Sequence, residues 1–133
     1  MALKGGSRFP VTMADVFPYG CHLVPNSIGE AEDYDEKTKT RRPAIDKVTG
    51  SRVWQCRVSD NDPELGARSH EVVVKLLGDR EPTAPTGVLF EPVEFDRLMV
   101  TPYVTDKGRL AFSLRAMGIK AARPAGQPGK EAA

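Results

Sequence analysis

Proline and glycine are spaced so densely along this chain that no long helix fits between them. The 133 residues include eleven prolines and twelve glycines. Proline removes a backbone donor and clashes with the preceding helical turn, and glycine favours turns. The apolar residues must therefore reach a core as short strands joined by turns. A chain of this length is expected to form one domain.

The clearest strand is the stretch S-H-E-V-V-V-K-L-L-G, which ends at Gly78. Its three consecutive valines are β-branched and favour extended backbone. Tyr19–Val24 is a candidate for the first strand. A hairpin is predicted further along, with arms Thr38–Ile45 and Arg52–Ser59 joined by a turn that contains Gly50.

Two more strands are expected near the C-terminus, in V-E-F-D-R-L-M-V-T-P-Y-V-T-D and R-L-A-F-S-L-R-A-M-G-I-K-A. The turn T-D-K-G between them favours antiparallel pairing, so the second segment is predicted to pair with Val93–Tyr103. In strand register Phe112 and Leu114 share the face expected in the core, whereas Ser113 and Arg115 take the wetter face.

These segments predict a mostly β protein, a small barrel or sandwich of five to six antiparallel strands. An OB-like barrel is the first choice. Residues 1–120 are expected to form one β-rich domain in which residues 25–39 are an acidic polar loop. Residues 121–133 are expected to be a disordered tail, and both termini are expected to be flexible.

Charge and cysteine content narrow the functional classes. The net charge is +1, which points to neither nucleic acid nor membrane. Residues 107–133 nevertheless carry six basic residues and one acidic residue, so phosphate contact near the C-terminus is one reading. Cys21 and Cys56 are expected to be reduced and buried. Without a recognisable leader or long apolar run, the expected location is the cytoplasm.

Signatures of catalysis and cofactor binding are missing. His22 and His70 lack a paired ligand motif, and there is no C-x-x-C, H-E-x-x-H or Walker-type loop. The acidic cluster at residues 30–36 lacks the spacing of a calcium loop. We therefore predict a protein that is not an enzyme and that holds no cofactor or metal.

Binding of nucleic acid is the more plausible activity. Sequence-tolerant binders of single strands need a basic groove and exposed aromatic faces. Trp54 shares a strand face with Cys56 and Val58, which favours a core position over a base-stacking one. Tyr103, beside a proline near a strand end, is the aromatic side chain most readily placed outside. The predicted nucleic-acid-binding residues are Arg41, Arg42, Arg52, Arg57, Lys75, Tyr103, Arg109 and Arg115.

Whole segments of the chain also resemble a known family. The segments are M-A-L-K-G-G with V-T-M-A-D-V-F-P-Y-G-C-H-L-V, then D-K-V-T-G-S-R-V-W-Q-C-R-V-S-D-N-D-P, then V-E-F-D-R-L-M-V-T-P-Y-V-T-D-K-G-R-L-A-F-S-L-R-A-M-G-I-K. They resemble small actinobacterial proteins of integrative conjugative elements and plasmids, described as activators of replication, integration and excision. The resemblance spans about residues 1–120. It implies an accessory role in the replication or excision of a mobile element and assigns no site residues.

Together these observations predict an accessory factor that binds DNA, preferably single-stranded, through a basic strand face. The alternative is a regulator that docks on a replication initiator or excision complex through a strand edge near Pro43 or Pro102. Sequence-specific transcriptional activation ranks lower because no helix-turn-helix pattern is present. A homodimer is a further expectation for a small β domain with open edges.

Overall fold

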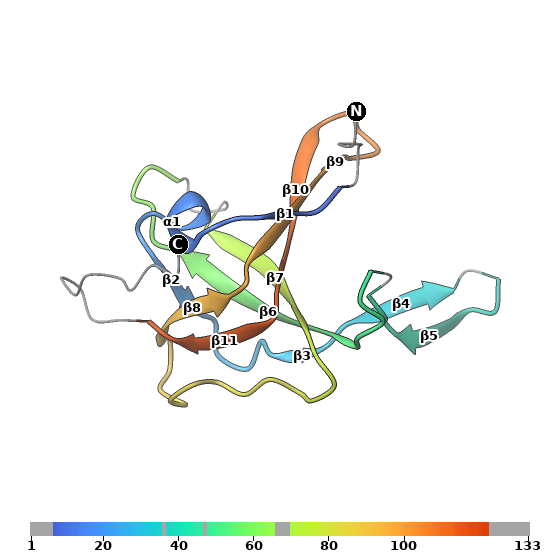
Figure 1. The fold of residues 1–133 in the computed structure, drawn as a ribbon, viewed down its shortest axis with the longest axis horizontal. Helices are drawn as coiled ribbons and strands as arrows, with labels where there is room; N and C mark the ends of the chain where they lie inside the picture. The colour runs from blue at the N-terminus through green and yellow to red at the C-terminus, as the bar shows by residue number, and fades with distance from the viewer. Residues whose placement is uncertain (1–6, 36, 47, 66–69, 123–133) are drawn as a thin grey trace.

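The computed structural model describes residues 7–35, 37–46, 48–65 and 70–122, and within them the chain is almost entirely strand and turn (Figure 1). The mostly β, barrel-like architecture expected from the sequence is confirmed. The described helix, α1 (Met13–Val16), is a single turn capped by Thr12. The strands are β1 (Phe9–Pro10), β2 (Cys21–Leu23), β3 (Gly29–Glu30), β4 (Glu32–Asp35), β5 (Thr40–Pro43), β6 (Val53–Asp60), β7 (Glu71–Leu77), β8 (Pro92–Asp96), β9 (Met99–Val104), β10 (Leu110–Ala116) and β11 (Gly118–Ala121).

The main sheet curls into a half-barrel because its pairings, together with the chain connection from β10 to β11, form a circuit. β2 pairs with β6 and β6 with β7, both antiparallel, and β7 pairs with β10 in parallel. β10 pairs with β9, and β11, which follows β10, pairs with β8. β8 returns the circuit to β2. The described strands outnumber the predicted five to six, because short strands flank the circuit, and one pairing is parallel where all were expected to be antiparallel.

The predicted pairing of the two C-terminal segments is confirmed, as one long hairpin with a bend. β9 faces β10 from Leu110↔Val104 to Arg115↔Met99, and β8 faces β11 in the same continuous register. The bend lies at Arg97, whose φ of 52° breaks the extended backbone. The Met117 amide still donates to the Asp96 carbonyl at 2.8 Å. One half of the hairpin can therefore pair with β7 while the other half pairs with β2.

The predicted hairpin between Thr38–Ile45 and Arg52–Ser59 is wrong apart from one bridge, Ile45↔Arg52. β5 pairs instead with β4, inside the segment predicted to be an acidic loop, and forms a separate two-stranded arm (Figure 1). β6 pairs along its length with β7. That pairing joins two segments whose alternate residues are apolar, so it buries more apolar surface than the exposed β5 could.

The predicted tail begins slightly later than expected. Ala121 still pairs with Val93, and the Ala122 amide donates to the Pro92 carbonyl at 3.1 Å. Residues 1–6 and 123–133, expected to be flexible, lie outside the described residues.

Apolar side chains pack on both faces of the curled sheet. The larger cluster fills the inside, and β6 contributes Trp54, Cys56 and Val58 to it. The smaller cluster lies on the outer face, where Val53 and Leu77 are covered by Ala31 and Ala44. The segment between β2 and β6 thus covers part of the outer face and leaves the rest open.

A buried carboxylate organises this covering segment. Asp46 lies in the turn between Ala44 and Val53, and its side chain is 1% exposed. Arg8 donates to it twice, at 3.1 and 2.6 Å, and Thr49 donates through its amide and hydroxyl, both at 2.9 Å. Arg115 of β10 is a second cation, at 3.5 Å. The hydrogen bonds from Arg8 and Thr49 hold the pKa of Asp46 well below its usual range, despite the opposing effect of burial.

Replacing Asp46 should strongly destabilise the protein. Asp46→Asn leaves two partly buried guanidinium groups without their counter-ion, so we expect a loss of about 3 kcal/mol in the free energy of unfolding. Urea unfolding followed by Trp54 fluorescence measures it. Asp106→Asn, at an exposed turn position, is the matched control and should change little. Equal stabilities of Asp46→Asn and wild type would show that the ion pairs contribute nothing.

Asp46 should also make the free energy of unfolding depend on pH in the acidic range. Because its folded-state pKa is lowered, its contribution is present above the unfolded pKa of about 3.9 and is lost as the pH falls below it. We expect the free energy of unfolding of the wild type to decrease between about pH 5 and pH 2. The decrease should be shallower in Asp46→Asn, and parallel curves for the two proteins would contradict the assignment.

Candidate nucleic-acid interface

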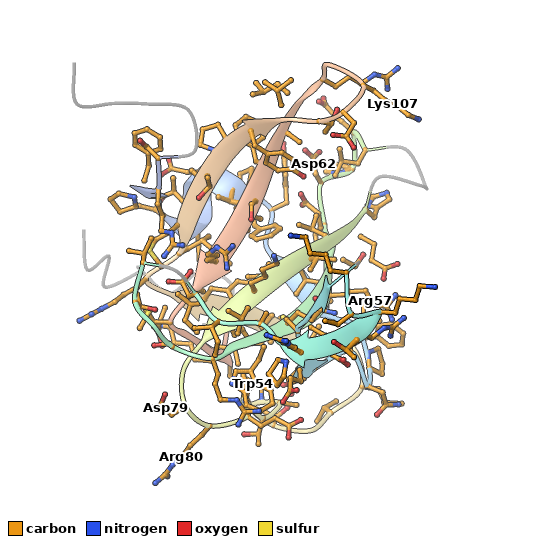
Figure 2. All side chains as sticks on the ribbon, turned by 90° about the vertical axis from the view of Figure 1, so that its right-hand side faces the viewer. Trp54, Arg57, Asp62, Asp79, Arg80 and Lys107 are labelled. Atoms are coloured by element: carbon orange, nitrogen blue, oxygen red, sulfur yellow. The ribbon has the colours of Figure 1, made fainter. Side chains whose placement is uncertain are left out.

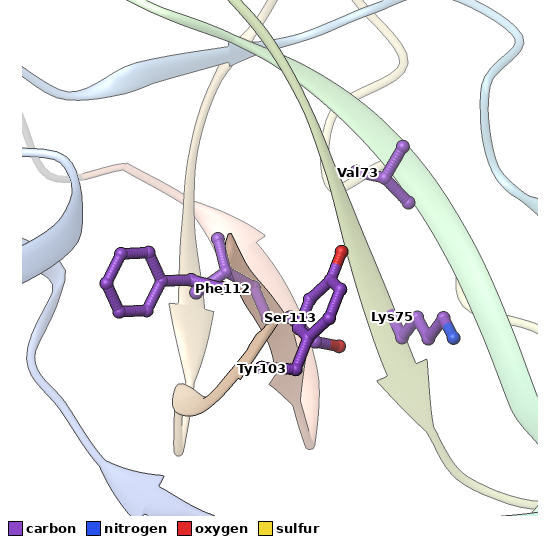
Figure 3. Close-up of a pocket in the computed structure, with 6 residues that line it drawn as sticks. Val73, Lys75, Tyr103, Phe112 and Ser113 are labelled. Carbon is purple, nitrogen blue, oxygen red and sulfur yellow. The ribbon is translucent and has the colours of Figure 1, made fainter. Parts of the chain in front are cut away.

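The open part of the outer face is formed by β6, β7, β9 and β10. Side chains alternate along a strand, so the buried Val74 and Leu114 leave their neighbours Val73, Lys75 and Ser113 pointing outward. The parallel register aligns β10 with β7 at Leu114↔Val74, and Tyr103 of β9 lies beside Ala111. These outward positions meet at a pocket of about 340 Å³ (Figure 3). Its lining is Val73, Lys75, Tyr103, Phe112, Ser113 and Leu114.

Tyr103 is the aromatic face of this pocket. Its side chain is 47% exposed, which confirms its predicted outside position. In Figure 3 the ring stands over Ser113 on the side that faces β7, where Val73 and Lys75 lie. The pocket therefore combines a phenol ring, an aliphatic wall, a hydroxyl and an ammonium group. Such a set can stack on a flat ring while contacting a phosphate.

Phe112 was expected in the core, and this expectation is wrong, because its side chain is 60% exposed. It shares the inner face with the buried Leu114, and its ring points away from Tyr103 (Figure 3). The β9–β10 end of the hairpin extends beyond the barrel, so the inner face there has no opposing strand to cover it. Strand alternation predicted the face correctly but could not show where the core ends.

Two of the predicted arginines, Arg57 in β6 and Arg52 directly before it, are each in an ion pair. Arg57 is aligned with Val73 across the β6–β7 pairing and bonds to Glu71. Arg52 bonds to Glu30, and its guanidinium lies over the Trp54 ring, 4.4 Å from the centroid. Both pairs are substantially exposed, so a phosphate can compete with either carboxylate. In Figure 2, Arg57 lies higher in the view than Trp54.

Trp54 is a core residue, as predicted. It is 6% exposed, and its indole nitrogen donates to the Gly78 carbonyl at 2.9 Å. Arg52 covers its remaining surface. A base could therefore reach the ring only after Arg52 moved.

The remaining predicted cations are spread over the molecule. Arg41 and Arg42 are exposed on β5, in the arm that projects beside the barrel (Figure 1). Arg109 is exposed at the hairpin turn, where its amide donates to the Thr105 hydroxyl at 3.2 Å. The structure thus brings Arg57, Lys75 and Tyr103 onto one face and leaves Arg41, Arg42 and Arg109 at its margins.

Arg115 was predicted to contact phosphate from the wet face, and the structure gives it a carboxylate partner within the protein. The residue does take the outer face, aligned with Lys75 in the parallel pairing. The Asp46 turn covers that position, however, and its guanidinium faces the Asp46 carboxylate. Arg115 therefore takes part in the structural ion pairs around Asp46, with its side chain 20% exposed.

The groups with reactive chemistry are engaged elsewhere. His22 Nδ1 lies 2.5 Å from the Asn61 amide oxygen, and His70 Nδ1 lies 2.8 Å from the Asp60 carbonyl. No group of three or more potential metal ligands is found among the described residues. Cys21 and Cys56 are free and buried, and burial raises the pKa of each thiol to about 12. Neither thiol is poised as a nucleophile.

Neither Val73 of the pocket nor the structural role of Asp46 was predicted from the sequence. Val73 is one of three consecutive valines, and alternation along β7 would have placed it on the face opposite to that of Val74. Asp46 was missed because nothing local shows that a turn aspartate will meet an arginine 38 residues earlier in the chain. Long-range partners of this kind leave no signal in spacing or periodicity.

Comparison of the chain with protein-family models, curated proteins and solved structures finds no match in any of the three. In the described part of the chain, no helix combines the length and apolar character needed to cross a bilayer. What this protein does must therefore be inferred from its own geometry.

The thiols should be unreactive while the protein is folded. With a pKa of about 12, Cys21 and Cys56 hold almost no thiolate at pH 8, and both are buried. We expect a thiol-specific disulfide reagent to label neither cysteine in native protein and both in concentrated urea. Rapid stoichiometric labelling of native protein at pH 8 would show that a thiol is exposed or activated.

Proposed function

We propose that this protein binds single-stranded DNA across the open outer face of β6, β7, β9 and β10. The observation that carries the proposal is the pocket between Tyr103 and Lys75, which places a stacking ring beside a cation on a β-barrel surface. Every base offers a flat ring, so stacking of this kind tolerates any sequence. A double helix would hide its base faces from such a pocket.

The order of strand pairing supports this proposal. Numbered along the chain, the five strands of the circuit are β2, β6, β7, β8–β9 and β10–β11. Strand 1 (β2) pairs with strand 2 (β6) and with strand 4 (β8). Strand 3 (β7) pairs in parallel with strand 5 (β10). An OB-type barrel has this arrangement, and it binds oligonucleotides on its second and third strands with help from the loops between strands 1 and 2 and strands 4 and 5. Here those parts are β6, β7, the β4–β5 arm and the hairpin turn.

The electrostatics favour a modest affinity that depends only weakly on salt. Arg57 is paired with Glu71, and the whole chain has a net charge of only +1. Few phosphates would be neutralised, so the slope of log affinity against log salt should be shallow. Stacking on Tyr103 would then supply a large share of the binding.

The biological setting we propose is an accessory role in the replication or excision of a mobile genetic element. It rests on the resemblance of whole segments to actinobacterial activators of replication, integration and excision. Single strands arise during both processes, so a small binder of single-stranded DNA would serve either one.

Docking on a replication or excision protein without DNA contact is the second candidate. One observation favours it: β1 pairs with β9 only at Met99 and Val100, so the same edge of β9 continues unpaired from Thr101 to Val104 among the described strands. An extended segment of a partner could add a strand there. Such an interface would depend less on salt than phosphate contact does.

Oligonucleotide binding tests the proposal. Labelled oligo(dT) titrated with protein should show rising anisotropy at low salt, and Tyr103→Ala should weaken affinity about tenfold through lost stacking. Tyr19→Ala is the matched control, because Tyr19 is also exposed but lies between α1 and β2. Lys75→Gln should weaken binding at low salt and reduce the salt slope.

Three results would count against single-strand binding. The first is no anisotropy change at micromolar protein in low salt. The second is equal losses for Tyr103→Ala and Tyr19→Ala. The third is a clear preference for duplex of the same length, since a duplex cannot stack its bases on Tyr103.

A further inference from the structure

The structure has two exposed apolar surfaces of three residues each. The first, here called the loop tip, is Val88, Leu89 and Phe90. The second, called the hairpin stripe, is Val104, Leu110 and Phe112 on the inner face of the β9–β10 end. All six side chains are between 59% and 71% exposed. Three adjacent large apolar side chains with such exposure indicate contact with another surface.

The loop tip is held in place at its base. Glu91 is buried, and its carboxylate accepts hydrogen bonds from the Thr86 amide, at 3.0 Å, and from the Thr86 hydroxyl. The Glu91 carbonyl also accepts the Leu23 amide at 2.8 Å, which ties the loop to β2. Phe90 has a φ of 55°, a left-handed conformation that a bulky residue seldom adopts. A strained, exposed aromatic on a pinned loop is not explained by the contacts of its own fold.

The hairpin stripe is apolar for a different reason. Val104 faces Leu110, and Phe112 faces Pro102, on the side of the ribbon that continues into the barrel core. The β9–β10 ribbon extends beyond the barrel, so its inner face has no opposing strand there. Tyr103 points to the other side of the ribbon, away from the Phe112 ring (Figure 3). Of the three stripe residues, Phe112 is also in the lining of the proposed DNA-binding pocket.

The two surfaces differ in the sign of the surrounding charge. Among the charged residues from 79 to 96, Glu91 is buried and Asp96 is ion-paired with Lys120. The others are Asp79, Glu81 and Glu94 against Arg80, which leaves a net acidic charge. The hairpin turn carries Lys107 and Arg109 against Asp106. An acidic apolar tip complements a basic apolar stripe, whereas two tips or two stripes would repel each other.

The two surfaces cannot meet within one molecule. In Figure 1 the turn between β9 and β10 is at the top and the loop that leads into β8 is at the bottom. Figure 2, turned by 90°, again shows Lys107 at the top and Asp79 and Arg80 at the bottom. A contact between tip and stripe must therefore join two copies.

We propose that the protein associates head to tail, with the loop tip of one copy docking on the hairpin stripe of the next. Such a contact uses two different surfaces, so each added copy leaves one tip and one stripe available. The buried area of three side chains against three is small, which makes the association weak and dependent on concentration. The inference does not depend on DNA binding, because association is measured on DNA-free protein.

Sedimentation velocity on DNA-free protein tests the proposal. The wild-type sedimentation coefficient should rise from micromolar to near-millimolar protein without stopping at a dimer. The loop variant, Val88→Ser with Leu89→Ser, and the hairpin variant, Leu110→Ser with Phe112→Ser, should each stay monomeric. Val48→Ser removes an equally exposed valine elsewhere and should behave as wild type.

Mixing the two variants gives the sharpest test. The loop variant keeps its stripe and the hairpin variant keeps its tip, so an equimolar mixture should form a one-to-one dimer and nothing larger. A wild type that stays monomeric at every concentration would overturn the proposal. So would a single variant that still associates, or a mixture that stays monomeric.

A charge variant keeps the test decisive if a serine variant fails to fold. Lys107→Glu with Arg109→Glu changes only exposed turn positions. The circular dichroism spectrum should be unchanged while self-association is lost. Association as strong as that of the wild type in this folded variant would overturn the proposal.

Discussion

The curl of the sheet into a half-barrel depends on the short parallel pairing between β7 and β10. Without it the bent hairpin would be joined to the rest of the sheet only through β8 and β2. Arg115 lies within that pairing, and Asp46 holds it from the outer face together with Arg8. One buried carboxylate thus ties the N-terminal segment, the turn before β6 and the closing strand to one another. Buried ion pairs of this kind are costly to break once formed, because each partner would be left desolvated.

The length of the hairpin decides which surfaces remain open. β9 and β10 continue past the strands they pack on, so both faces of their free end are uncovered. The outer face has Tyr103 beside Lys75 of β7, and the inner face has the hairpin stripe. The sheet lies between these two faces, and Phe112 belongs both to the hairpin stripe and to the lining of the pocket. The segment between β2 and β6 sets the far limit of the outer face by covering Val53 and Leu77.

Much of the local structure could be predicted from the sequence. The valine run became β7, the C-terminal segments paired as expected, and Trp54 is in the core with Cys56 and Val58. The predictions that failed all required knowledge of distant partners. β5 was assigned to β6, yet β6 pairs with β7, which buries more apolar surface. Phe112 was assigned to the core because alternation gives the face of a side chain, not the place where the barrel ends. Arg115 was assigned to solvent because Asp46 lies 69 positions away in the sequence.

The sequence by itself determined which kinds of local structure the chain can form. Densely spaced prolines and glycines excluded long helices, and alternating apolar residues defined strands and their inward faces. These are local effects of backbone sterics and side-chain periodicity. Only the tertiary structure decided which strands pair, that one pairing is parallel, and that a turn aspartate is buried between two arginines. It also decided that Tyr103 and Lys75 share a pocket while Phe112 is left exposed. Those outcomes depend on apolar burial and charge pairing summed over residues far apart in the chain, and no short stretch of sequence contains that sum.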